Sequence, residues 1–282
     1  GRPVLEEDYD FVTPHYLRYK YDGTITNAVA YPLTRALYGQ RVRQPIGGDF
    51  GFSGRLAGVY SRKKVWESDI ARFGIDIWMT TLAINEGFEV CQACIGLKLH
   101  NNKDPGSDLG AMFRQVCGTM FGLMKVYERK WMAVRGSQPA PVLGEQCRDE
   151  PEEAVVSVEN LRDHFRKGYE ELQDIWRIAM RPENYREAER IYHLPDEKFE
   201  FSSGLWARTV YDFAIAYNFG PLKPQAVVDA LLPLYCARTA HFVKRTEGMS
   251  SYEAEIEVEG TAETFEALKE YLRYFWRIAK RR

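Results

Sequence analysis

The chain has 282 residues, which is enough for two ordinary domains and for a large hydrophobic core. Hydrophobic residues make up 45% and charged residues 28% of the sequence, the balance of an ordinary globular protein. The formal net charge of −2 gives no electrostatic support for a nucleic-acid partner, so we expect none. No apolar run approaches the roughly 18 residues of a membrane span, and the acidic N-terminal segment is unlike a signal peptide.

The cysteines predict a reducing environment. There are five of them at irregular spacing, and an odd number in a chain of this size argues against a disulfide framework. We therefore expect a cytoplasmic protein. Cys91 and Cys94 form a C-x-x-C, but they lie in a strand-like run without a second pair for zinc, so we interpret them as ordinary sheet side chains.

Strand-like and helix-like segments alternate as far as about residue 102. The segment 24–38 has helical periodicity and ends at Gly39, and Pro32 inside it predicts a kink or a late start of the helix. The other elements that we predict here are strands at 11–13, 42–46, 49–53 and 88–99 and helices at 54–63 and 75–86.

From residue 107 onward the periodicity is only helical. The segment 136–156 is rich in proline, glycine and charge and is predicted to be a linker. The fold class is thus α/β over residues 1–135, followed by a mostly helical C-terminal domain over 157–282, which we expect to mediate homo-oligomerisation. The predicted helices cover 109–131, 158–180, 183–192, 205–219, 224–242 and 262–278.

Two polar residues stand at places that suit chemistry. Asp76 follows Gly74 by two positions, in the first turn of a predicted helix, where an acid either complements the helix dipole or serves as a fixed catalytic carboxylate. His100 closes a predicted strand, and the strand ends of α/β proteins often carry metal ligands or bases. A lone histidine is more often structural, so this alternative stays open.

The glycine-rich stretch 43–54 reads RQPIGGDFGFSG and suggests a phosphate loop. Its spacing fits neither the P-loop nor the dinucleotide fingerprint. Gly47 and Gly48 instead indicate a tight bend or a close approach of the backbone to a ligand, and Asp49 is a turn residue or a hydroxyl acceptor. Upstream, aromatic residues interleave with basic ones over 15–24, a pattern that suits stacked bases or a small anionic or polyhydroxylated ligand.

The order of these motifs carries a resemblance. Q-P-I-G-G-D at 44–49, G-I-D at 74–76, a histidine at a strand end and then a long helix resemble the second half of a GT-A glycosyltransferase, close to the mannosylglycerate synthase group. The motifs cover about residues 10–130. The resemblance implies a partial GT-A fold and a transferase that moves a hexose from a nucleotide sugar to a small hydroxylated acceptor such as glycerate.

Site residues follow from the resemblance. It implies that Asp76 is the catalytic base and that His100 ligates a divalent cation, Mg²⁺ or Mn²⁺, which neutralises the charge of the departing diphosphate. The sugar and acceptor pocket would be lined by Gln44, Ile46, Gly47, Gly48 and Asp49, and the acceptor carboxylate would be bound near Arg18, Lys20 and Thr24.

The sequence also departs from that group. Asn101 and Lys103 stand where the group has a basic residue and a tyrosine, which implies a different acceptor. The nucleotide-binding half, with its D-x-D metal motif, would precede residue 1, so we expect this chain alone to bind a donor weakly. Two alternatives are a non-catalytic interaction module and a metal-dependent hydrolase.

Overall fold

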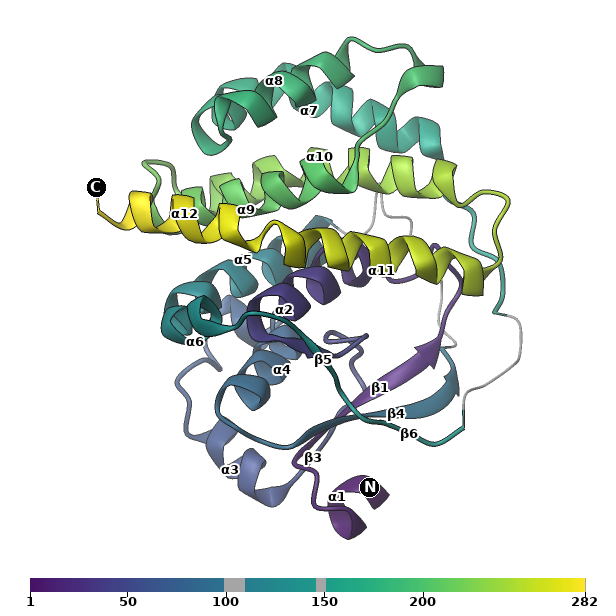
Figure 1. Cartoon of the computed structure of the whole chain (residues 1–282), viewed down its shortest axis with the longest axis vertical. Helices are drawn as coiled ribbons and strands as arrows, with labels where there is room; N and C mark the ends of the chain where they lie inside the picture. Colours follow the sequence, from purple (N-terminus) through teal and green to yellow (C-terminus); the bar gives the residue numbers. More distant parts are fainter. Residues whose placement is uncertain (99–109, 146–150, 282) are drawn as a thin grey trace.

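The computed structural model describes residues 1–98, 110–145 and 151–281. Figure 1 shows a small sheet at one end of the molecule, with the helices of the first half beside it and the C-terminal helices stacked farther away. The prediction of a mixed α/β region followed by a helical region is confirmed.

Two parallel strands form the centre of the sheet. β1 (Phe11–Leu17) pairs with β4 (Val90–Leu97) in register from Phe11 opposite Val90 to His15 opposite Cys94. The short β3 (Gly51–Phe52) runs antiparallel to β1, and β6 (Val142–Leu143) runs parallel to β4, which gives the order β3-β1-β4-β6. Because β1 and β4 are parallel, the segments that follow the two strands leave the sheet at the same edge.

A second, two-stranded sheet pairs β2 (Gln40–Arg41) with β5 (Gln138–Pro139). Both β5 and β6 lie within the segment 136–156 that we predicted to be a linker, so part of that segment is anchored to the α/β region. The cysteines of the C-x-x-C are free and lie in β4, as predicted.

The strand predicted at 42–46 is wrong. The backbone N–H of Arg43 donates to the side-chain Oε1 of Gln92 at 2.6 Å and not to a neighbouring strand. Pro45 has no N–H to donate, and the N–H of Gly47 turns back to the carbonyl of Gln44 at 3.2 Å. The segment is a loop held by side chains, and of the strand predicted at 49–53 only β3 forms.

Pro32 reshapes the first long helix. A π-helical turn, η1 (Thr26–Ala30), leads into α2 (Tyr31–Tyr38), which ends at Gly39 with a left-handed φ of 70°. Pro32 cannot donate to the carbonyl of Ala28, and the indole Nε1 of Trp206 donates to that oxygen at 2.7 Å instead. The predicted disturbance is confirmed, and a C-terminal helix supplies the missing donor.

Most of the remaining helices agree with the predictions, but two predicted helices are divided and the prediction missed the start of the helix Ser251–Ala267. The segment 109–131 is divided at Tyr127, and 262–278 is divided at Leu268. The first half contains α1 (Arg2–Glu6), α3 (Gly54–Ser61), η2 (Asp69–Ala71), α4 (Ile75–Asn85), α5 (Gly110–Val126) and α6 (Glu128–Ala133). The second half contains α7 (Val158–Ala179), α8 (Pro182–Tyr192), η3 (Asp196–Lys198), α9 (Ser203–Phe219), α10 (Pro224–Arg245), α11 (Ser251–Ala267) and α12 (Lys269–Lys280).

The largest hydrophobic cluster crosses the predicted domain boundary. It contains Leu33 and Phe121 from the first half and Trp206, Leu231 and Trp276 from the second half, all buried. By length and composition α10 also qualifies as a membrane-spanning helix, and 72% of its apolar window is buried inside the protein. A helix at the centre of a protein core has the same composition, so the absence of a membrane span stays a prediction.

α7 and α10 cross closely at Gly168. A Cβ atom added to Gly168 would lie 2.2 Å from Cβ of Pro233, a proline inside α10, whereas one added to Gly122 in α5 meets nothing within 4 Å. Gly168 is thus required for the helices to approach, and Gly122 is not.

We expect Gly168→Ala to lower the free energy of unfolding by about 1–3 kcal/mol, because the methyl group forces the two helices apart. The matched control Gly122→Ala should raise it by about 0.5–1 kcal/mol, since alanine is the better helix former. Urea denaturation measures both, and equal effects of the two substitutions would contradict the packing described here.

Candidate functional site

Asp76 lies in the first turn of α4, where the packing of Gly74 fixes the start of the helix. A Cβ atom on Gly74 would lie 2.2 Å from Oγ1 of Thr119 in α5, so only glycine allows this approach. The Asp76 carboxyl borders a hollow of about 450 Å³ between α3, α4 and the loop that contains Gly48. Its position therefore depends on a rigid helix start.

The electrostatic state of Asp76 is unusual. Burial, reinforced by the negative charge of Asp49, raises the pKa of Asp76 to about 6, while Lys98 opposes the shift. No hydrogen bond joins the carboxyl to any residue in the described part of the chain. A half-buried carboxylate without a donor costs stability, which is common for groups that act on a ligand.

Asp49 joins the ends of the two central strands. Lys98, directly after β4, places its Nζ 2.6 Å from Oδ2 of Asp49 and 3.2 Å from the hydroxyl of Tyr16 in β1. The Tyr16 hydroxyl also donates to Asp49. The donors from Lys98 and Tyr16 lower the pKa of Asp49, so this carboxylate stays ionised beside the one with the raised pKa. Asp49 is thus a hydroxyl acceptor, one of the two roles predicted.

The two glycines of the Q-P-I-G-G-D segment have different surroundings. Gly47 packs against the ring of Pro14, where an added Cβ would lie 2.2 Å from Cγ. Gly48 has a φ of 88°, and an added Cβ would lie 3.8 Å from Oδ2 of Asp76. Gly48 therefore borders the hollow, while Gly47 serves the scaffold and Ile46 packs against the hydrophobic core.

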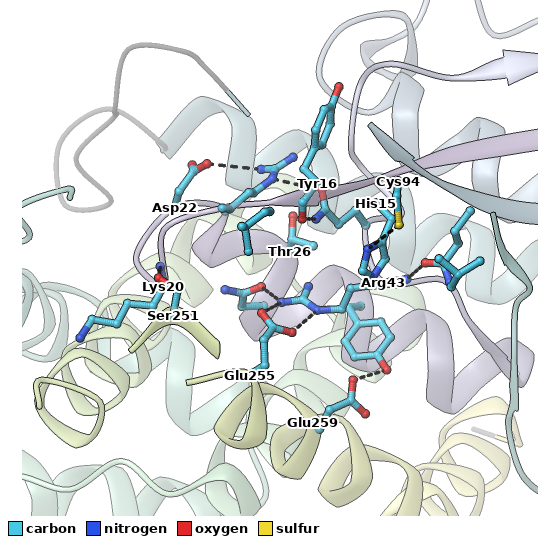
Figure 2. A pocket seen from close by; sticks show the side chains of 18 of the residues that line it. His15, Tyr16, Lys20, Asp22, Thr26, Arg43, Cys94, Ser251, Glu255 and Glu259 are labelled. Carbon is cyan, nitrogen blue, oxygen red and sulfur yellow. Dashed lines mark hydrogen bonds and ion pairs between the residues drawn. The ribbon is translucent and has the colours of Figure 1, made fainter. Parts of the chain in front are cut away.

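A second cavity of about 470 Å³ lies between the end of β1 and α11 (Figure 2). Arg18, Lys20 and Gln44, three residues of the predicted sugar and acceptor site, line it together. Gln44 donates to the carbonyl of Tyr16 at 2.8 Å and accepts from Nε of Arg18 at 3.1 Å, and a guanidinium nitrogen of Arg18 lies 3.8 Å from Asp22. Tyr16, which donates to Asp49, lines this cavity too.

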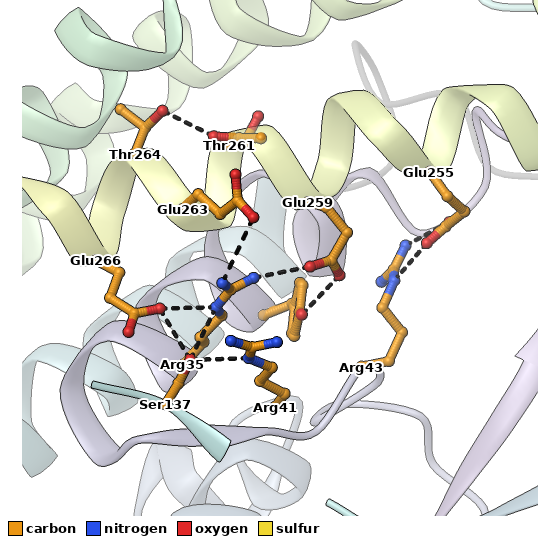
Figure 3. A network of polar contacts seen from close by, with 12 residues as sticks. Arg35, Arg41, Arg43, Ser137, Glu255, Glu259, Thr261, Glu263, Thr264 and Glu266 are labelled. Carbon is orange, nitrogen blue, oxygen red and sulfur yellow. Dashed lines mark hydrogen bonds and ion pairs between the residues drawn. The ribbon is translucent and has the colours of Figure 1, made fainter. Parts of the chain in front are cut away.

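Two arginines of the first half, Arg43 in the cavity wall and Arg35 in α2, are paired with glutamates of α11. Figure 3 shows Arg43 reaching Glu255, with N–O distances of 2.7 and 2.8 Å, and Arg35 reaching Glu259 and Glu266 at 2.7 and 2.9 Å. Arg43 also donates to Asn27 at 2.8 Å. These pairs fix α11 on the α/β region, and the pair with Glu255 neutralises Arg43, one of the basic residues next to the glycine-rich stretch.

Lys20 and Thr24 of the predicted acceptor site make internal contacts. The buried ammonium of Lys20 donates to the carbonyls of Thr246, Glu247 and Met249 at 2.8, 3.1 and 2.6 Å, just beyond the end of α10. The Thr24 hydroxyl lies 2.6 Å from that of Tyr235 in the core. Neither residue borders the hollow at Asp76.

The metal ligand and two acceptor residues of the prediction, His100, Asn101 and Lys103, lie outside the described residues. Within residues 1–98, 110–145 and 151–281, no group of three or more histidine, cysteine, aspartate or glutamate side chains is placed to hold a metal ion. The divalent cation therefore stays a prediction.

Sequence reasoning missed the aromatic lining of the hollow and the role of Lys98. The lining residues come from the β3–α3 region and from the loop before α4, and no periodicity links them in the sequence. The rings that border the hollow are Phe50, Phe52, Tyr60 and Trp66.

No protein-family model matches the chain, and a comparison with curated proteins gives no match. The geometry of the residues and the order of the motifs are therefore what bears on function.

Lys20→Met should lower the free energy of unfolding by about 1–3 kcal/mol, because three carbonyls near the end of α10 lose their donor. The control Lys167→Met removes a 74% exposed lysine and should change it by less than about 0.5 kcal/mol. Thermal and urea denaturation compare the two. An unchanged stability of the Lys20 variant would show that the ammonium is free to bind a ligand.

Proposed function

We propose that the protein is a nucleotide-sugar-dependent hexosyltransferase that acts on a small hydroxylated acceptor, with Asp76 as the proton acceptor. The supporting observation is the Asp76 carboxyl itself: it is fixed on a helix start, lacks a hydrogen bond to described residues, has a raised pKa and faces an open hollow. The order of the Q-P-I-G-G-D and G-I-D motifs and the strand-end histidine agrees with this proposal.

The transfer requires a group that accepts a proton. The acceptor oxygen forms a bond to the anomeric carbon, the bond from that carbon to the β-phosphate oxygen breaks, and the acceptor hydroxyl loses its proton. A carboxylate with a pKa of about 6 is ionised at neutral pH and is more basic than an ordinary aspartate. Such a base contributes roughly 10²–10⁴ in rate.

The second carboxylate keeps a fixed charge near the base. Because Lys98 and Tyr16 hold Asp49 ionised, its negative charge favours the protonated form of Asp76 after transfer. His100, two residues after Lys98, would hold the divalent cation, and that ion would neutralise charge on the departing diphosphate. Asp49 and Lys98 would thus set the basicity of Asp76 without taking up the proton.

The proposal predicts a pH profile. The rate of transfer should rise with pH through about 6 as Asp76 loses its proton and then level off, whereas an unshifted aspartate would level off near 4. Asp49→Asn should move the midpoint to lower pH, because it removes the negative charge that raises the pKa of Asp76. The measurement is kcat against pH for the full-length protein, and an unmoved midpoint would exclude this coupling.

Asp76→Asn should reduce kcat by a factor of about 10²–10⁴ and leave the affinity for the donor little changed. The folded-state pKa of Asp76 is raised, so the ionised carboxylate lowers the stability of the folded protein by its full amount above that pKa. This cost disappears as the pH falls from the folded-state pKa to the pKa of Asp76 in the unfolded chain. The same substitution should therefore raise the free energy of unfolding at pH 7.5 by about 1–3 kcal/mol.

The measurements are transfer from a panel of nucleotide hexoses to glycerate and related acceptors with Mn²⁺, and urea denaturation at pH 7.5. Asp174→Asn, at a position 88% exposed, is the matched control and should change neither quantity. Near-normal turnover of the Asp76 variant would remove Asp76 from the catalytic residues. If instead the wild-type protein transferred sugar to none of these acceptors, the interaction module would be the better interpretation.

A further inference from the structure

The hollow beside Asp76 has an aromatic wall that the chemistry of proton transfer does not require. Trp66 is 50% exposed and Phe52 is 42% exposed, and both border the hollow. Large aromatic side chains usually bury most of their surface, so two half-exposed rings on one hollow are a feature that needs an explanation.

Buried rings hold the exposed ones in place. Trp66 meets Trp78 at a centroid distance of 6.0 Å with an interplanar angle of 72°, and Phe52 meets Tyr60 at 5.7 Å and 85°. Tyr60 and Trp78 are themselves in contact at 5.2 Å, which joins the four rings into one chain. Tyr60 is anchored further by its hydroxyl, which donates to the carbonyl of Met79 at 2.8 Å.

These near-perpendicular contacts leave ring surface free toward the hollow. A platform of this kind is pre-organised, because Tyr60 and Trp78 are 3% and 4% exposed and cannot move without disturbing the core. The same hollow is bordered by the carboxyl of Asp76, which has no hydrogen bond to the described residues, and by the backbone of Gly48. The hollow thus combines an apolar wall with a hydrogen-bond acceptor.

A pyranose ring matches both parts. Its C–H face is apolar and packs on an aromatic ring, while its hydroxyl groups donate to a carboxylate. The volume of about 450 Å³ lies in the usual range for small-molecule sites and is far larger than a three-carbon acid needs. The second cavity differs, because Arg43 in its wall is already paired with Glu255.

We infer that the hollow binds a hexopyranose ring, with Trp66 and Phe52 as stacking residues that determine specificity and Asp76 as the acceptor of a sugar hydroxyl. The inference rests on the proposed function, since that function brings a sugar to Asp76. The ring belongs either to the acceptor or to the hexose of the donor, and both sources present the same chemistry to the platform.

The first experiment measures binding and needs no turnover. Saturation-transfer NMR with the methyl α-D-pyranosides of glucose, mannose and galactose, and with glycerol as the small polyol, gives Kd values for the full-length protein. We expect at least one glycoside to bind and glycerol to bind at least tenfold more weakly. Trp66→Ala and Phe52→Ala should each raise the glycoside Kd at least fivefold, and Trp66→Phe, which keeps a ring, should restore most of the affinity.

Tyr252→Ala is the matched control. Tyr252 is 82% exposed and lines the second cavity, so its loss should leave the glycoside Kd unchanged. Near-UV circular dichroism checks that each variant is folded. Failure of every glycoside to bind the wild-type protein would overturn the inference, as would an unchanged Kd in both Trp66→Ala and Phe52→Ala or a weaker affinity in the Tyr252 variant.

The second experiment separates the two sources of the ring. If the ring is the acceptor, Trp66→Ala raises the KM for the acceptor alone. If it is the donor hexose, Trp66→Ala weakens binding of the nucleotide sugar and leaves binding of the nucleoside diphosphate unchanged. If the wild-type protein transfers no hexose but binds a glycoside in a way that depends on Trp66 and Phe52, the proposed function is refuted and this inference stands. If hexose transfer occurs and Trp66→Ala does not affect it, this inference is refuted and the proposed function stands.

Discussion

The candidate site depends on the parallel pairing of β1 with β4. Parallel strands leave the sheet at the same edge, so Tyr16 near the end of β1 and Lys98 just after β4 meet although 81 positions separate the two residues in the sequence. Asp49 reaches both of them from the glycine-rich loop, and Asp49 in turn raises the pKa of Asp76. Without the register of the two strands, none of these charges would act on the others.

The helical region has a structural part in the same assembly. Arg35 and Arg43 of the first half are paired with glutamates of α11 (Figure 3). Trp206 of α9 donates to the carbonyl of Ala28, which Pro32 leaves without a donor. Lys20 completes the junction through the carbonyls beyond α10. Lys20 and Arg43, whose charge suggested a ligand, thus stabilise the contact between the two halves, whereas the Asp76 carboxyl has no hydrogen bond to the described residues.

That free group has an energetic cost, and the cost is informative. Elsewhere in the described chain a buried carboxylate such as Asp212 is held by Asn184 and Tyr271, whereas Asp76 has no donor. A carboxyl without a hydrogen-bond donor beside half-exposed aromatic rings is typical of a binding site for a ligand that has both apolar surface and hydroxyl groups. The proposed transfer of a hexose and the inferred platform for a pyranose follow from that combination.

The sequence by itself determined much of this protein. Helical periodicity located most of the helices, Gly39 indicated the end of α2, and Pro32 indicated its irregular start. The position of Asp76 in the first turn of a helix, two residues after a glycine, was also predicted. These are local properties that backbone geometry dictates. The start of α11 was missed because its glutamates mask the apolar periodicity and find their partners, Arg35 and Arg43, only across the tertiary structure. Which charges are already paired, that Gly48 and not Gly47 borders the hollow, and that Trp66 and Phe52 share a wall with Asp76 were decided by the tertiary structure alone, because contacts between residues far apart in the chain leave no periodic signal in the sequence.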